Sequence, residues 1–190
     1  SILFVFKILL LDKADKENCN YKMFDQNLKE KIRVLHVIGT LHIGGAENVA
    51  MNCLRYIDRD KYHIDFLVYD NEKSPYTEEV AELGGKVIRK NVLHNRFLIQ
   101  RSLIEVMKSS GPYDIVHSHL MFHNGYVMQV AKRCHIKKRI SMAHSTSDGR
   151  SKNSIIALIY RIYMRKLIKE NSTRYLACGQ KSGEYLYGKK

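Results

Sequence analysis

Three short segments of this chain carry the groups that could do chemistry. They are a glycine-containing loop at 39–47, the triplet His117-Ser118-His119, and the triplet His144-Ser145-Thr146. An imidazole titrates near neutral pH, so a histidine can act as a general base, hydrogen-bond a sugar hydroxyl or ligate a metal. Glycines let a backbone approach an anion, and a following helix N-terminus adds unpaired N–H groups. The loop is therefore a candidate anion site, and the histidines are candidates for proton transfer or metal binding.

Each of these segments follows a predicted β-strand, and the strands alternate with predicted helices from Lys31 onward. The strands are expected at 32–38, 64–69, 86–89, 113–117, 138–142 and 174–177, and the helices at 46–57, 75–83, 96–109, 124–134, 153–170 and 180–187. This alternation predicts an α/β fold with a doubly wound parallel sheet, Rossmann-like. Ligands bind at the carboxyl ends of such strands, so the three segments should meet at one edge of the sheet.

The length of 190 residues suits one domain plus an appendage. Residues 1–30 are an unassigned tail or appendage, and 31–188 form the predicted domain. The net charge is +13, and residues 131–190 hold 15 Lys and Arg against 3 Asp and Glu. Such a surface suits anionic lipid, nucleic acid or a polyphosphate ligand, or is simply a solvated face. The four cysteines are scattered without a C-x-x-C spacing, which predicts reduced thiols in a cytoplasmic protein.

The glycine loop does not match the standard nucleotide-binding patterns. It reads Gly39-Thr40-Leu41-His42-Ile43-Gly44-Gly45, which is neither G-x-G-x-x-G nor a Walker loop. Asp70 is the best candidate for an acidic residue that contacts a ribose. Tight turns also use glycine because it adopts positive φ. The loop by itself is therefore as typical of a tight turn as of a phosphate site.

The histidine pattern leaves a zinc site open as an alternative. His117 and His119 form an H-x-H pair, with His42, His123 and His144 expected nearby. Against zinc, the segment offers only one carboxylate, Asp114, at the buried start of its strand. We expect His117 to be a hydrogen-bonded strand residue and His119, the first residue beyond the strand, to take part in reaction chemistry. Cys178 is expected to be a small core residue.

The helix predicted at 153–170 combines an apolar stripe with basic residues. The stripe could face the core or a membrane surface. Its members are Ile155, Ile156, Leu158, Ile159, Ile162, Leu167 and Ile168. Aromatic and basic residues alternate along this helix, which nucleic-acid binding would require. No recognisable nucleic-acid module is present, however, so we predict no nucleic-acid partner.

Four motifs occur in order along the chain. They are the strand and loop Val34-Leu35-His36-Val37-Ile38-Gly39 … Gly44-Gly45-Ala46-Glu47, then Tyr113-Asp114-Ile115-Val116-His117-Ser118-His119, Ala143-His144-Ser145, and Tyr175-Leu176-Ala177-Cys178-Gly179. Together they closely resemble the N-terminal half of family 4 (group 1) glycosyltransferases, GT-B enzymes that build capsular, exopolysaccharide and lipopolysaccharide chains. The likeness covers about residues 31–188.

The resemblance implies a retaining enzyme with two Rossmann-like domains, which moves a sugar from a nucleotide sugar to a polysaccharide or lipid-linked acceptor. The N-terminal domain chiefly holds the acceptor, and its glycine loop, here Gly44 and Gly45 with Glu47, approaches the diphosphate of the donor. A histidine matching His119 lies near the reacting sugar as the catalytic candidate, and His144 and Ser145 line the same cleft. The resemblance implies no cofactor and no metal.

The family's C-terminal, donor-binding domain has no counterpart in these residues. We therefore expect the chain to be incomplete for catalysis and to need that domain or a partner chain. The basic surface fits peripheral docking on the anionic inner face of a membrane. Two alternatives remain: a non-catalytic sugar- or nucleotide-binding module and a histidine-metal hydrolase.

Overall fold

The computed structural model describes residues 31–92, 96–151 and 154–189, so the predicted tail at 1–30 lies outside the described residues. Six parallel strands form one sheet in the order β3-β2-β1-β4-β5-β6. This order confirms the predicted doubly wound, Rossmann-like fold. The strands are β1 (Ile32–Ile38), β2 (Tyr62–Val68), β3 (Val87–Arg89), β4 (Ile115–Ser118), β5 (Lys138–Ala143) and β6 (Arg174–Ala177).

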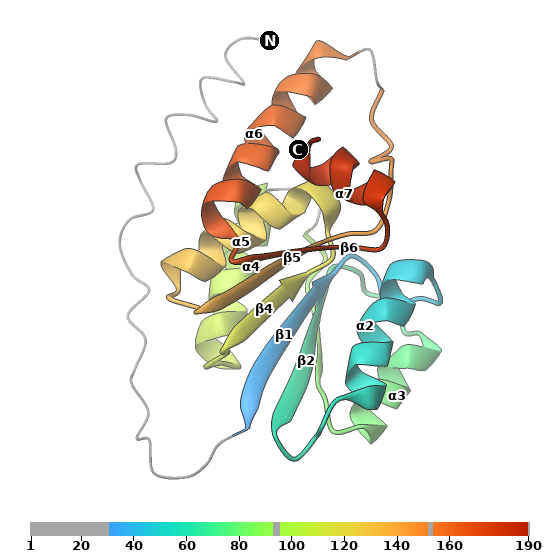
Figure 1. Cartoon of the computed structure of the whole chain (residues 1–190). Helices are drawn as coiled ribbons and strands as arrows, with labels where there is room; N and C mark the ends of the chain where they lie inside the picture. The colour runs from blue at the N-terminus through green and yellow to red at the C-terminus, as the bar shows by residue number, and fades with distance from the viewer. Residues whose placement is uncertain (1–30, 93–95, 152–153, 190) are drawn as a thin grey trace.

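Helices follow the strands and cover the sheet (Figure 1). They are α2 (Gly45–Tyr56), α3 (Pro75–Glu82), α4 (Arg96–Ser109), α5 (Asn124–Arg133), α6 (Ile155–Asn171) and α7 (Gln180–Tyr187), with a short 3₁₀ turn, η2 (Met121–His123), before α5. Helices α2 and α3 pack on one face of the sheet, and α4 and α5 pack on the other. Helix α6 packs against α5 and α7.

Burial on both faces explains why β1 is almost continuously apolar. Val34 and Ile38 pack with α2 and α3, whereas Leu35 and Val37 pack with α4 and α5. His36 shares the parity of Val34 and Ile38, because side chains alternate along a strand. A buried polar ring in this position needs a partner.

Strands β1 and β6 have the predicted limits, whereas the other four strands differ from the predicted limits by one or two residues. The register pairs Ile32 of β1 with Tyr62, so β2 begins before the apolar run that starts at Ile64. Strand β4 begins at Ile115 rather than Tyr113 and ends at Ser118, which leaves His119 as the first residue beyond the strand, as predicted. Backbone pairing sets these limits, and hydropathy follows them only approximately.

Helix α6 divides the predicted apolar stripe between two environments. Leu167 and Ile168 are buried in the core, together with Met164. The remaining five members are exposed: Ile155, Ile156, Leu158, Ile159 and Ile162. The core interpretation is therefore wrong for the N-terminal part of the stripe. None of the described helices is long and apolar enough to cross a membrane.

Candidate functional site

The three polar segments meet where the order of the strands reverses. Strands β1 and β4 are neighbours, but the chain leaves β1 into α2 on one face and leaves β4 toward α5 on the other. Diverging connections of this kind open a crevice at the carboxyl edge of a parallel sheet. The glycine loop, His119 and His144 follow the carboxyl ends of β1, β4 and β5 at this edge.

Three histidines and a cysteine form a continuous chain of polar contacts in this crevice. Nδ1 of His36 lies 2.9 Å from Nε2 of His119, and Nδ1 of His119 lies 2.8 Å from Nε2 of His144. Nδ1 of His144 in turn lies 3.2 Å from Sγ of Cys178. A neutral imidazole carries one N–H, so His119 donates to one neighbouring ring and accepts from the other. Both of its ring nitrogens are thus engaged.

The pairing of β1 with β4 brings a further ring, His117, to this cluster. His36 and His117 are register partners, and their ring centroids lie 4.8 Å apart. Nitrogen atoms of His36, His117 and His119 all lie within 4.8 Å of one another, and Nε2 of His117 is buried without a hydrogen-bond partner in the part of the chain that the structure describes. Among the described residues, these three imidazoles are the group that could hold a metal ion. The group contains no carboxylate, and a metal would have to displace the proton that His36 and His119 share.

Burial keeps the histidine cluster neutral. Burial, with the nearby His117, lowers the pKa of His36 well below its usual value, and burial does the same for His119, aided by its three histidine neighbours. Burial lowers the pKa of His117 to about 4. The pKa of His144 is also lowered by burial, but the negative charge of Glu47 opposes that shift. The rings of the cluster are therefore uncharged at neutral pH, and the hydrogen bonds between them join neutral groups.

Asn124 fixes the loop that carries His119. Its side chain is fully buried at the start of α5. The Oδ1 atom accepts hydrogen bonds from the Ser118 hydroxyl at 2.6 Å and from the Leu120 N–H at 2.8 Å. The Nδ2 atom donates to the Ser141 hydroxyl at 2.9 Å and to the Met142 carbonyl at 3.1 Å. One amide thus ties the end of β4 to β5 across the site.

The glycine loop is an open helix N-terminus and not a turn that needs positive φ. Gly44 is the N-cap of α2 with φ −162° and ψ 173°, and neither Gly44 nor Gly45 has positive φ. A Cβ on Gly44 would lie 2.5 Å from Oε2 of Glu47, whereas a Cβ on Gly45 would meet nothing within 4 Å. The Thr40 hydroxyl donates to Oε1 of Glu47 at 2.9 Å. The carboxylate of Glu47 therefore lies beside the N–H groups where an anion would approach.

Other residues expected near a metal have different partners. His42 lies 3.0 Å from Glu72, and His123 stacks on Tyr126 with ring centroids 6.1 Å apart. Asp114 is exposed, not buried as predicted, and accepts a hydrogen bond from the Arg33 N–H. Strand β4 begins at Ile115, directly after Asp114, so Asp114 lies outside the strand at the rim of the sheet.

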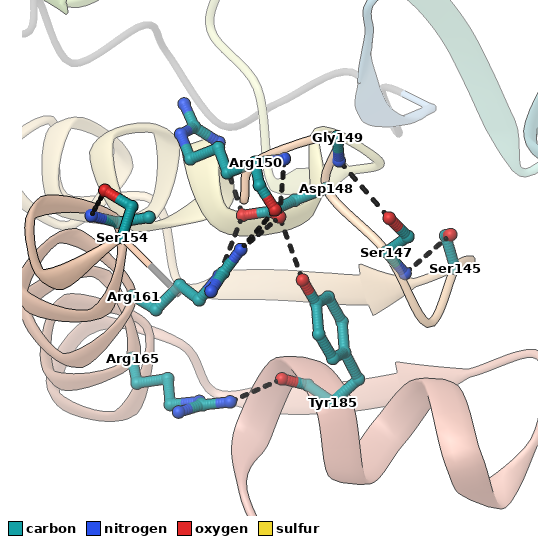
Figure 2. Close-up of polar contacts among 10 residues, drawn as sticks. Ser145, Ser147, Asp148, Gly149, Arg150, Ser154, Arg161, Arg165 and Tyr185 are labelled. Carbon is teal, nitrogen blue, oxygen red and sulfur yellow. Dashed lines mark hydrogen bonds and ion pairs between the residues drawn. The ribbon is translucent and has the colours of Figure 1, made fainter. Parts of the chain in front are cut away.

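The predictions for Ser145, Cys178 and Asp70 have different outcomes. Ser145 lies on the exposed loop after β5, where its hydroxyl accepts a hydrogen bond from the Ser147 N–H at 3.0 Å (Figure 2). Cys178 is exposed and contacts His144, so the prediction of a core residue is wrong. It follows an edge strand, which leaves it uncovered. Asp70 is engaged by the Arg89 guanidinium.

Sequence reasoning assigned no role to His36, to Asn124 or to Asp148. A polar ring inside the apolar strand β1 was the available signal for His36, and the chain offered no comparable signal for Asn124. Asp148 lies in the loop after β5 and binds Arg161, Arg150 and Tyr185 (Figure 2). This network borders a cavity of about 480 Å³, whose lining also includes Leu120, the residue after His119.

Comparison with known proteins places the chain in a family. Residues 43–188 match the model of Glycosyltransferase Family 4. The chain is 34% identical over 158 residues to EpsF of Bacillus subtilis (strain 168), which is named as a glycosyltransferase, and this match covers 82% of the chain and 41% of EpsF. It is 20% identical over 146 residues to the capsular polysaccharide biosynthesis glycosyltransferase CapH of Staphylococcus aureus, covering 72% of the chain and 40% of CapH.

A solved structure supports the fold. The crystal structure of Alr3699/HepE from Anabaena in complex with UDP superposes with a TM-score of 0.57 at 11% identity, covering 82% of this chain and 40% of that one. The chain spans about two fifths of the length of the curated relatives it matches. The family match and the identity to EpsF show that this chain belongs to glycosyltransferase family 4, with the Rossmann-like fold of the N-terminal domain of a GT-B enzyme.

Proposed function

We propose that this chain is the acceptor-side domain of a retaining glycosyltransferase that moves a sugar from a nucleotide sugar to a polysaccharide or lipid-linked acceptor. One observation carries the proposal. In a family 4 chain, the open N-terminus of α2 and the His36–His119–His144 chain lie at the same edge of the sheet. The names of EpsF and CapH, and the UDP in the HepE structure, support a nucleotide-sugar donor.

The glycine loop suits the diphosphate of the donor. Free N–H groups and the positive dipole end of α2 favour an anion, and the absence of side chains at Gly44 and Gly45 lets it come close. Glu47 limits this site because its carboxylate repels phosphate oxygens. A carboxylate accepts hydrogen bonds from hydroxyl groups, so we assign Glu47 to a sugar or ribose hydroxyl beside the diphosphate.

His119 suits the reacting sugar because its ring is neutral and held from both sides. Both ring nitrogens are engaged, so a sugar hydroxyl would take the place of the half-buried His144 at Nδ1 of His119. It would meet an imidazole that His36 already holds in one orientation, which costs little reorganisation during the reaction. Charge that develops on the leaving diphosphate is stabilised by the α2 N–H groups and by a second domain, on the same or another polypeptide. The matched relatives are more than twice as long as the matched segment, which supports that requirement.

The proposal is tested by binding and by turnover. We expect UDP titrated into the chain to shift amide resonances of residues 44–47, and Gly44→Val to abolish those shifts while His135→Ala, an exposed control, keeps them. In a full-length enzyme carrying this domain, Gly44→Val and His119→Ala should each lower turnover strongly, and the anomeric configuration of the product, read by NMR, should match the donor. Unchanged turnover in either variant, or an inverted product, contradicts the assignment.

We further propose that α6 docks this domain on an anionic membrane surface. Its exposed stripe has side chains that are 43% to 72% accessible, at helical spacing, within the segment that holds most of the positive charge. The triple variant Ile155→Ser, Ile159→Ser, Ile162→Ser should lose sedimentation with phosphatidylglycerol vesicles. Tyr56→Ser, which removes an 84% exposed side chain on α2, should not. Equal binding of both variants, or binding to neutral vesicles alone, contradicts this docking.

A further inference from the structure

A cavity beside the histidine cluster has the composition of a binding pocket. Its volume is about 480 Å³, and the residues that line it come from the loop after β4, the loop after β5, and α6. Leu120, the residue directly after His119, forms part of its wall, so the loop that carries His119 continues into the pocket lining. The other lining residues are Met121, Phe122, His123, Asp148, Gly149, Arg150 and Tyr160.

Among the described residues, the charges at this pocket do not balance. Asp148 accepts hydrogen bonds from Arg161 Nη2 at 2.8 Å and Nε at 3.2 Å, and from the Tyr185 hydroxyl at 2.9 Å. Burial alone would raise the pKa of Asp148, but the hydrogen bonds from Arg161, Tyr185 and the Arg150 N–H hold it well below its usual value. The carboxylate is therefore ionised, and Arg161, whose side chain is only 9% exposed, already neutralises it.

Arg150 is the surplus cation. Its Nη1 lies 3.4 Å from Oδ2 of Asp148, a long contact compared with those of Arg161, and its side chain is 37% exposed (Figure 2). Two guanidinium groups thus share one carboxylate, which leaves one positive charge on the pocket side. The guanidinium carbon lies 4.1 Å from the centroid of the Tyr160 ring, and this stacking restrains the side chain without adding a negative charge.

The remaining walls offer an apolar surface and a spare hydroxyl. Met121 is the partly exposed apolar residue of this wall, and Leu120 and Phe122, which are 9% and 1% exposed, lie beside it. The Tyr160 hydroxyl is buried without a hydrogen-bond partner among the described residues, and burial raises the pKa of this phenol, so it keeps its proton. A buried polar atom without a partner is costly. Because that oxygen is covered, a ligand would reach it only if the Tyr160 side chain shifts, and such a shift would give the hydroxyl the partner it lacks.

We propose that this pocket binds an anionic sugar, whose carboxylate or phosphate pairs with Arg150 and whose ring packs on the apolar wall beside Tyr160. A guanidinium binds either anion through two parallel N–H groups. The role of this sugar as the acceptor rests on the proposed function, because only then does the pocket present a hydroxyl to His119. Binding at the pocket itself does not depend on that function.

The test compares three ligands that differ in charge. Methyl β-D-glucuronide, glucose 1-phosphate and neutral methyl β-D-glucoside are titrated separately into the 190-residue chain, followed by amide shifts in NMR. We expect at least one anionic sugar to bind about tenfold or more tightly than the neutral one, with shifts at residues 120–123 and 148–150. Preference for the glucuronide identifies a carboxylate ligand, and preference for glucose 1-phosphate identifies a phosphate ligand.

Three variants separate the roles of the wall residues. Arg150→Gln should remove the preference for anionic sugars while the chain stays folded, because Asp148 keeps Arg161 and Tyr185. Arg150→Lys should retain part of the preference for anionic sugars. Tyr160→Phe should weaken the binding of all three sugars. Arg59→Gln serves as the matched control, since Arg59 is exposed on the loop between α2 and β2, at the opposite edge of the sheet.

Two results overturn the inference: equal affinity for charged and neutral sugars, or an unchanged preference in Arg150→Gln. Failure of the proposed function gives a different pattern. If UDP does not bind, or binds equally to Gly44→Val, the nucleotide site is wrong. The pocket stands if Arg150→Gln alone removes the preference for anionic sugars.

Discussion

Nε2 of His119 lies 2.9 Å from Nδ1 of His36, a fully buried histidine that is distant in sequence and adjacent in the sheet. This contact, with that of Nδ1 of His119 to His144 at 2.8 Å, occupies both ring nitrogens of the residue predicted to be catalytic. His119 is therefore one member of a hydrogen-bonded chain, and His36 is a positioning residue that, with His144, holds the orientation of its ring.

Replacing His36 with Phe should raise the pKa of His119. The ring keeps its stacking on Phe66, whose centroid lies 5.3 Å away, but it no longer contacts His119 through a nitrogen. Burial is the main cause of the low His119 pKa and remains in the variant. Only the smaller lowering effect of His36 is lost, so the pKa of His119 should rise slightly and stay below its usual value. The measurement is an NMR titration of the His119 Cε1–H resonance. The control is His135→Gln, in an exposed turn. An unchanged or lower His119 pKa contradicts the influence of His36 on His119.

The domain should lose stability as pH falls below about 6.5. A histidine with a lowered pKa binds fewer protons in the folded protein than in the unfolded one. Its contribution to the free energy of unfolding is therefore fully present when the pH is above the unfolded pKa. This contribution is lost as the pH falls toward the folded pKa. For His117, whose folded pKa is about 4, the loss across this window is about 3 kcal/mol. Urea unfolding at pH 8, 6, 5 and 4 measures it. A flat profile over this range contradicts the neutral, buried cluster.

Replacing Asn124 with Ala should destabilise the domain by about 3 kcal/mol or more, because it leaves several buried polar groups without partners. Those groups belong to Ser118, Leu120, Ser141 and Met142. Asn52→Ala is the matched control, since the Asn52 amide accepts a hydrogen bond from Arg55 at the exposed surface of α2, and its loss should change stability by less than about 0.5 kcal/mol. The free energies come from urea unfolding, and similar values for the two variants contradict the proposed role of Asn124.

The purified chain should contain no stoichiometric zinc. Three imidazoles would have to hold a buried divalent cation without a carboxylate to balance its charge. The cation would also break the hydrogen bond between His36 and His119. Elemental analysis after dialysis against zinc measures the content. One equivalent of zinc that disappears in His119→Ala but persists in His42→Ala would contradict this expectation and favour the metal-hydrolase alternative.

Much of the fold could be predicted because it depends on local patterns. Strand β1 reads as an apolar run that ends in glycines, and α4 was predicted at its observed limits, Arg96–Ser109. Strand limits were less accurate where polar residues such as Tyr62 join the ladder. The burial of α6 could not be read from its periodicity, because Ile159 and Leu167 are equally apolar, and only the second packs on other elements.

The sequence by itself determined which segments meet, since parallel strands that alternate with helices bring their carboxyl ends to one edge. It thereby placed Gly44, His119 and His144 in one site. Only the tertiary structure decided that His36 belongs to that site, that His42 does not, and that Arg150 faces a pocket. His36 and His119 are 83 residues apart, and their contact depends on the register of β1 with β4 and on the burial of both rings. Hydrophobic period indicates the face on which a side chain lies, whereas the distance between two side chains on that face is set by packing.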